Sequence, residues 1–185
     1  MSPQVRLVPV GPEHEAAVQE YASDPLVGEM TLVPHPYPPG GARDFIAAAT
    51  RRRSEGKEWV FAILEGEDFR GLVGVLAHED PVRHGEVGYW IGKPFRGKGL
   101  ATRAAALVVD FAFREAGLPF LRSFCLERNP ASARVLEKAG FTNAGPYLNE
   151  NPKWPPEEPF RAYSLSRAAW EGSHRSSTPS PGRAC

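Results

Sequence analysis

The sequence lacks a long apolar run and an excess of charge of either sign. Nowhere do about 18 apolar residues follow one another, as a membrane-spanning helix requires, and the first residues, MSPQVRLVPV, carry no apolar run of signal-peptide length. A cytoplasmic location is the expectation that follows. Lys plus Arg and Asp plus Glu both number 22, so no net field draws the chain onto nucleic acid or anionic lipid. We therefore expect neither a nucleic-acid partner nor a membrane partner.

Cysteine is also scarce, and its placement argues against a structural disulfide. Cys125 lies in the apolar stretch LRSFCLE, whereas Cys185 is the last residue, so we expect Cys125 to be a small buried hydrophobic residue. With 185 residues, 42% of them hydrophobic and 24% charged, the chain has the size and composition of one globular domain. We expect this domain to span residues 1–171 and residues 172–185 to form a disordered tail.

Alternating apolar residues and turn residues predict an α/β domain with a mixed, mostly antiparallel sheet of six to seven strands and helices on both faces. Five prolines predict an irregular loop from Asp24 to Pro39. The predicted strands are Val5–Val10, Trp59–Leu64, Leu72–His78, Gly85–Ile91, Phe120–Leu126, Phe141–Leu148 and Phe160–Ser166, and the predicted helices are Glu13–Ser23, Ala42–Glu55, Leu100–Glu115 and Pro130–Ala139.

A glycine-rich loop, GKPFRGKG, joins the strand that ends at Ile91 to the long helix that begins at Leu100. Gly97 and Gly99 allow successive amides to turn inward, and the helix start adds unpaired N–H groups and a positive dipole end. Arg96 and Lys98 would add mobile positive charge at the rim. The loop therefore predicts a binding site for a pyrophosphate.

Two common phosphate-binding motifs do not match this loop. In a Walker loop, a serine or threonine would stand at Gly99 to bind magnesium, and Pro94 removes an amide. The dinucleotide fingerprint would need a third glycine and a downstream acidic residue, and both are missing.

The pattern Arg-x-x-Gly-x-Ala from Arg96 to Ala101 does match a third motif. It resembles the pyrophosphate loop of the GNAT family of N-acetyltransferases. The flanking segments EVGYWIGKPFRGKGLAT and NPASARVLEKAGF follow one another as in that family's cofactor-binding core, and look like its RimJ/RimL-like branch, which acetylates ribosomal protein N-termini. The resemblance is specific from about Gly85 to Phe141 and looser over Val5–Trp170.

The resemblance implies that acetyl-CoA is the co-substrate and that no metal is needed. In the family, a bulge splays the strand before the loop, and an amide of that strand, here Ile91, donates to the acetyl carbonyl. The side chains of Tyr89 and Trp90 could instead simply pack in the core. The cofactor-binding residues that the resemblance implies are Tyr89, Trp90, Ile91, Arg96, Gly97, Lys98, Gly99, Leu100, Ala101, Thr102 and Asn129.

Strand alternation places Glu86 on the same face as Gly88 and Trp90. The carboxylate of Glu86 could accept the amine proton, a role that its position also has in the RimJ/RimL-like branch; the alternative is a solvent-facing or ion-paired glutamate. Ser132 corresponds to a serine proposed to protonate the thiolate of CoA, although such a serine often only satisfies local backbone groups.

Two further positions of the short helix Pro130–Ala139 bear on the mechanism. Many family members carry a catalytic tyrosine where this sequence has Leu136, which argues against a tyrosine acid in that helix. Asn129 corresponds to a residue that hydrogen-bonds CoA, and asparagine before proline is also a good N-cap.

The expected reaction is direct transfer of acetyl from acetyl-CoA to a primary amine of a protein N-terminus or a small molecule. His35, Tyr37 and Trp154 are candidates for the lining of the amine site. The resemblance to the family also suggests a homodimer. A non-catalytic CoA-binding sensor or scaffold remains an alternative, as does a magnesium-dependent nucleotide-binding protein, against which Gly99 argues.

Overall fold

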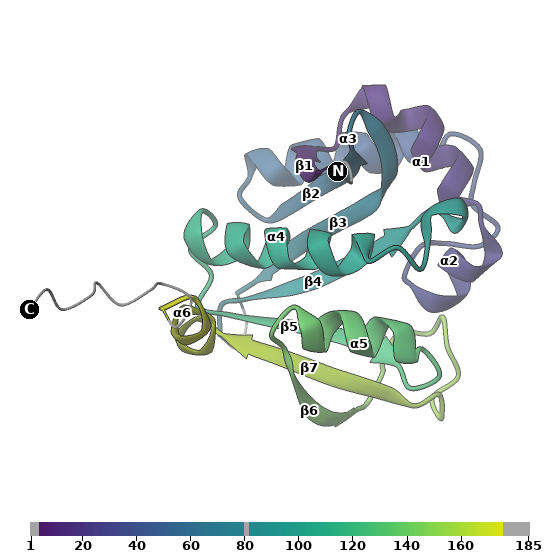
Figure 1. The fold of residues 1–185 in the computed structure, drawn as a ribbon. Coiled ribbons are helices and arrows are strands. Elements are labelled where there is room, and N and C mark those ends of the chain that lie inside the picture. Colours follow the sequence, from purple (N-terminus) through teal and green to yellow (C-terminus); the bar gives the residue numbers. More distant parts are fainter. Residues whose placement is uncertain (1–3, 80–81, 176–185) are drawn as a thin grey trace, which may run out of the picture.

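The structure, a computed structural model, describes residues 4–79 and 82–175 and contains one seven-stranded sheet in the order β1-β2-β3-β4-β5-β7-β6. The order of strands and longer helices agrees with the predicted order, apart from α2 and α6 (Figure 1). The strands are β1 Val5–Pro9, β2 Glu58–Glu65, β3 Asp68–His78, β4 His84–Ile91, β5 Phe120–Leu126, β6 Thr142–Tyr147 and β7 Phe160–Ser166. The helices are η1 Pro12–His14, α1 Glu15–Ala22, α2 Pro25–Met30, α3 Gly41–Ser54, η2 Lys93–Phe95, α4 Leu100–Arg114, α5 Pro130–Lys138 and α6 Arg167–Arg175.

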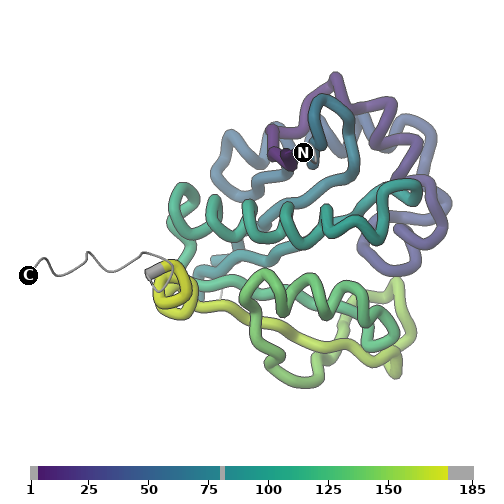
Figure 2. The backbone as a smooth tube through the Cα atoms, viewed as in Figure 1, coloured from purple at the N-terminus to yellow at the C-terminus, as the bar shows by residue number. Residues whose placement is uncertain are grey.

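The sheet is antiparallel except between β4 and β5, where the crossover through α4 brings two parallel strands together. These two strands pair only at Gly85 with Leu121 and at Glu86 with Arg122. Beyond these pairs β4 and β5 diverge toward the loop between β4 and α4 (Figures 1 and 2). We call this opening the fork.

The bulge that the resemblance implied for this strand is wrong. The pairing of β4 with β3 runs from Gly71↔Ile91 to His78↔His84 without a shift in register. The fork therefore arises because β5 turns away from a regular β4.

Helices cover both faces of the sheet, so two apolar clusters form the core. Figure 1 shows α4 and α5 side by side in front of the strands, with α3 behind them. Leu100, Val108 and Val87 belong to the cluster beneath α4, whereas Ile46 and Leu72 belong to the cluster beneath α1 and α3. Complete burial of a side chain such as Leu100 contributes roughly 1.5–3 kcal/mol. We call the two faces of the sheet the α4 face and the α3 face.

Two segments differ from the sequence predictions. The loop predicted for Asp24–Pro39 contains α2, because Asp24 caps this helix by accepting a 3.1 Å hydrogen bond from the Leu26 amide and Pro25 suits the first helical position. The final helix α6 was not predicted, and it extends to Arg175. Residues 172–175, expected in the tail, are therefore helical, while 176–185 lie outside the described residues. Over the described ranges, every helix is too short or too polar to cross a membrane.

Candidate functional site

A single cavity of about 900 Å³ runs through the fork and joins the start of α4 to the opposite face of the sheet. Every residue predicted for catalysis or cofactor binding lines this cavity except Lys98, whose side chain is exposed. The predicted residues that line it are Glu86, Tyr89, Trp90, Ile91, Arg96, Gly97, Gly99, Leu100, Ala101, Thr102, Asn129 and Ser132.

The loop before α4 forms a cradle of backbone donors. Gly97 and Gly99 adopt φ values of 77° and 73°, a left-handed conformation that residues with a Cβ rarely adopt. Gly99 is the N-cap of α4 and supplies no side chain to the helix. The first backbone bond of α4 runs from the Arg103 amide to the Gly99 carbonyl, at 3.1 Å, which leaves the preceding amides available to a ligand or water.

This cradle fits a diphosphate. Within 4 Å of a Cβ added at Gly97 or at Gly99 there is no other group of the described structure, so both positions face open space. Unpaired amides and the positive end of a 15-residue helix meet at that space.

Arg96 is anchored to the protein, whereas the sequence predicted a mobile charge at the rim. Its Nη2 lies 2.5 Å from Oδ2 of Asp24, and its Nε donates to the Ile91 carbonyl at 3.0 Å. Desolvation by itself raises the pKa of Asp24, but hydrogen bonds from the Leu26 amide and Arg96 outweigh it and hold that pKa below its usual value. Arg96 thus ties the cradle to the start of α2.

The backbone of β4 presents donors to the fork. In an antiparallel pair, the polar groups of successive residues point alternately toward and away from the partner. The Gly92 amide donates to Arg70 of β3 at 2.8 Å. The carbonyls of Val87 and Ile91 point the other way, since they accept from Ser123 Oγ at 2.8 Å and from Arg96. The Ile91 amide therefore points into the fork, as its predicted role as a donor to the acetyl carbonyl requires.

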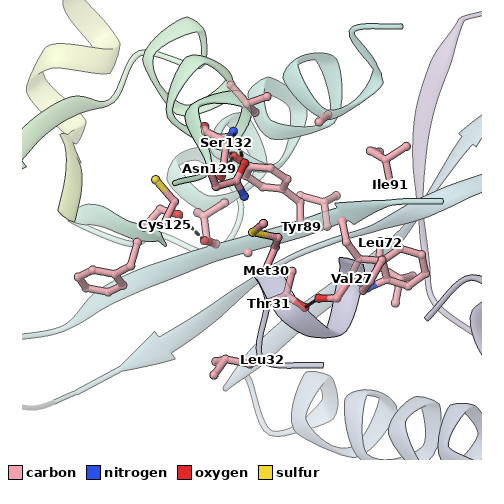
Figure 3. Close-up of a pocket in the computed structure, with 18 of the residues that line it drawn as sticks. Val27, Met30, Thr31, Leu32, Leu72, Tyr89, Ile91, Cys125, Asn129 and Ser132 are labelled. Atoms are coloured by element: carbon pink, nitrogen blue, oxygen red, sulfur yellow. Dashed lines mark hydrogen bonds between the residues drawn. The ribbon is translucent and has the colours of Figure 1, made fainter. Parts of the chain in front are cut away.

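A hydroxyl pair that the sequence did not reveal lies on the α4 face of the fork. The Tyr89 hydroxyl is 2.9 Å from Ser132 Oγ and donates to the Ser132 carbonyl at 3.1 Å. Figure 3 shows both residues on one wall of the cavity, next to Asn129. Burial raises the pKa of Tyr89 well above its usual value, and the hydrogen bond to Ser132 offsets this only partly, so the phenol stays protonated at neutral pH.

Three residues at or near this wall have contacts within the protein. The side chain of Asn129 accepts a 3.1 Å bond from the Ser132 amide, which confirms its predicted role as the N-cap of α5. Leu136 is fully buried in the core. Cys125 is a buried free thiol, as expected, and burial raises its pKa.

Glu86 lies on the α3 face, where the cavity opens toward the α2 side of the molecule. Its side chain is 33% exposed, and its Oε2 is 3.3 Å from Nε2 of His78. The predicted alternation is therefore confirmed, because Glu86 and the hydroxyl pair lie on opposite faces of the sheet.

Exposed apolar side chains gather at the mouth on this side, beside the polar residues Glu58, Glu150 and Asn151. Four large side chains that line the cavity are also well exposed, namely Leu26, Leu32, Phe45 and Tyr147. Trp154 lines it as predicted and donates to the Glu29 carbonyl at 3.1 Å. The prediction is wrong for His35 and Tyr37, which are not part of the lining; Tyr37 packs against the apolar cluster of the α3 face. In the described parts of the chain, there is no group of three or more His, Cys, Asp or Glu side chains that could hold a metal ion.

Known proteins resemble this chain in sequence. The chain is 37% identical over 109 residues to the probable N-acetyltransferase YjcK of Bacillus subtilis. This match covers 57% of this chain and 60% of that protein. It is 30% identical over 180 residues to the FsC-acetyl coenzyme A-N(2)-transacetylase of Aspergillus fumigatus, covering 90% of this chain and 75% of that protein. The chain thus spans less than two thirds of the first of these relatives.

A solved structure shares the fold at low sequence identity. RimL, a ribosomal L7/L12 alpha-N-protein acetyltransferase in complex with coenzyme A, matches with a TM-score of 0.78 at 18% identity, over 89% of this chain and 95% of that one. The family model described as an acetyltransferase (GNAT) domain matches residues 4–142. The chain therefore belongs to the GNAT acetyltransferase family.

Proposed function

We propose that this protein is an acetyl-CoA-dependent N-acetyltransferase that transfers acetyl directly to a primary amine. The observation that carries the proposal is the continuous cavity, which links the uncapped start of α4 to the Glu86 carboxylate through the fork. The diphosphate of CoA binds in the cradle at one end of it, and the amine enters from the apolar mouth at the other. Family membership supports this assignment.

We assign one group of the site to each step of the reaction. The Ile91 amide points into the fork and stabilises the charge that develops on the acetyl oxygen. Glu86, directly or through water, takes the proton of the attacking amine. The hydroxyl pair of Tyr89 and Ser132 lies across the sheet and delivers a proton to the departing thiolate.

The mouth favours an amine that carries an apolar group. Exposed apolar side chains that gather at one place mark a binding surface, whereas isolated ones are ordinary. Leu32 is 61% exposed and Leu26 43%, and both border the opening that leads to Glu86. The acceptor is then the N-terminus of a protein with apolar first residues or a small amine that carries an apolar group.

Two measurements test the function. Acetyl-CoA should raise the melting temperature, because a ligand that binds only the native state stabilises it by mass action, whereas ATP with magnesium should not. Free thiol should then appear with a panel of peptides, apolar amines and polyamines. Stabilisation by ATP would support the nucleotide-binding alternative, and binding of acetyl-CoA without thiol release from any amine would support the sensor alternative.

Two further expectations remain predictions, namely a cytoplasmic location and a homodimer. Light scattering of the purified protein measures the oligomeric state directly. A monomer at all concentrations would contradict it.

A further inference from the structure

His78, the last residue of β3, contacts Glu86 from outside the cavity. His78 faces His84 across the strands and Leu76 faces Glu86, so the two side chains are diagonal neighbours on one face of the sheet. The His78 Nε2 atom lies 3.3 Å from Glu86 Oε2. This nitrogen is buried, and its contact with Glu86 is not aligned as a hydrogen bond.

Part of the His78 side chain reaches solvent. The His78 side chain is 36% exposed, and because Nε2 is buried, the exposed area belongs to the rest of the side chain. Glu86 lines the cavity, whereas His78 does not. His78 therefore contacts the proposed base from the side away from the cavity.

A neighbouring ring holds this imidazole in place. His84 stacks on His78 with ring centroids 4.9 Å apart and planes inclined by 15°. His84 is itself fixed, since it is buried, stacks on Phe120 at 5.2 Å and places Nδ1 2.7 Å from the Val82 carbonyl. The stack fixes the plane of His78 with Nε2 toward Glu86.

The proposed reaction needs a route for one proton per turnover. An ammonium acceptor loses two protons when it becomes an amide. One of them ends on the sulfur of CoA, and the other must leave the cavity. The hydroxyl pair protonates the sulfur on the opposite face of the sheet. The second proton therefore has to leave from Glu86.

We propose that His78 is a proton relay that carries this proton from Glu86 to solvent, an inference that rests on the proposed function. As the new C–N bond forms and the C–S bond of the thioester breaks, the Glu86 carboxylate takes the proton of the amine and passes it to Nε2 of the imidazole. The ring releases a proton from Nδ1 to water, so that the charge of the pair is restored, and the ring returns to its starting tautomer by exchange with water before the next turnover.

The first experiment compares His78→Ala with His174→Ala. His174 offers a matched control, because its Nε2 lies 3.4 Å from Asp110 Oδ1 in a similar imidazole–carboxylate pair away from the cavity. Thiol release should show kcat lowered by roughly 10²-fold in His78→Ala, with KM for both substrates unchanged, and added imidazole buffer should restore part of kcat. His174→Ala should behave as wild type, with or without imidazole.

An independent experiment asks whether Glu86 and the imidazole communicate, without relying on turnover. The ¹⁵N signal of His78 Nε2 should move in Glu86→Gln, while that of His174 should not. An unchanged Nε2 signal would overturn the relay, as would a His78→Ala enzyme that retains wild-type kcat. If wild type releases no thiol with any amine, the proposed function fails instead, and the relay fails with it.

Discussion

Gly99→Glu places a carboxylate in the cradle where the diphosphate is proposed to bind, and Gly56→Glu is its matched control. Both glycines have positive φ, 73° and 68°, and an added Cβ has no neighbour within 4 Å at either position. Gly99 lines the cavity and Gly56 does not. The left-handed conformation costs a residue with a Cβ roughly 1–2 kcal/mol, so both variants should lose the same few degrees of melting temperature, about 2–8 °C.

CoA binding should separate the two variants. Two unit charges 4 Å apart repel by about 1 kcal/mol in water and by about 4 kcal/mol at the effective dielectric constant typical of a protein surface. Since each 1.4 kcal/mol is a factor of ten, the affinity of Gly99→Glu for CoA should fall between roughly fivefold and 10³-fold. Titration calorimetry measures this loss in both folded variants. Equal CoA affinity in Gly99→Glu and Gly56→Glu would refute the assignment of the cradle.

Three further predictions concern the fork and its surroundings. Glu86→Gln should lower kcat by about 10²–10⁴-fold while the Kd for acetyl-CoA is unchanged, and a wild-type rate of thiol release would contradict the role of Glu86 as the base. Tyr89→Phe should lower the free energy of unfolding by about 1 kcal/mol, measured in urea, because Ser132 loses a buried partner; an unchanged midpoint would show that the hydroxyl pair does not form. The pKa of Asp24 is lowered in the folded protein, so its contribution to stability is present above the unfolded value, near 3.8, and is lost as the pH falls through the folded value. In urea unfolding, the free energy of unfolding of Asp24→Asn should therefore fall less steeply than that of wild type as the pH drops below 3.8, and an equally steep fall would contradict this.

The sequence alone located most of the fold, because the signals are local. Apolar runs bounded by turn residues define β2, β3 and β4, and glycines and capping residues bracket α4 and α5. The predicted strands Phe120–Leu126 and Phe160–Ser166 coincide with β5 and β7. The two helices that were not predicted also have local causes. Asp24 and Pro25 are a capping signal that starts α2, but they lie in a segment with five prolines. Helix α6 follows β7 directly, with no turn between them.

The sequence predicted the residues of the candidate site but not the contacts between them. The glycines of the cradle and the face of Glu86 follow from chain-local rules, since φ preferences and strand alternation depend on near neighbours. The contacts that give these residues their chemistry join distant parts of the chain. Arg96 and Asp24 are 72 positions apart, and Tyr89 and Ser132 are 43 apart.

What only the tertiary structure decided is which side chains meet across the fork. The register of β3 against β4 sets His78 beside Glu86, and the divergence of β5 from β4 opens the cavity between the cradle and the mouth. A one-residue change in register would move each of these side chains to the other face of the sheet. The sequence by itself determined the local conformations and the faces, whereas strand pairing determined the distances on which proton transfer depends.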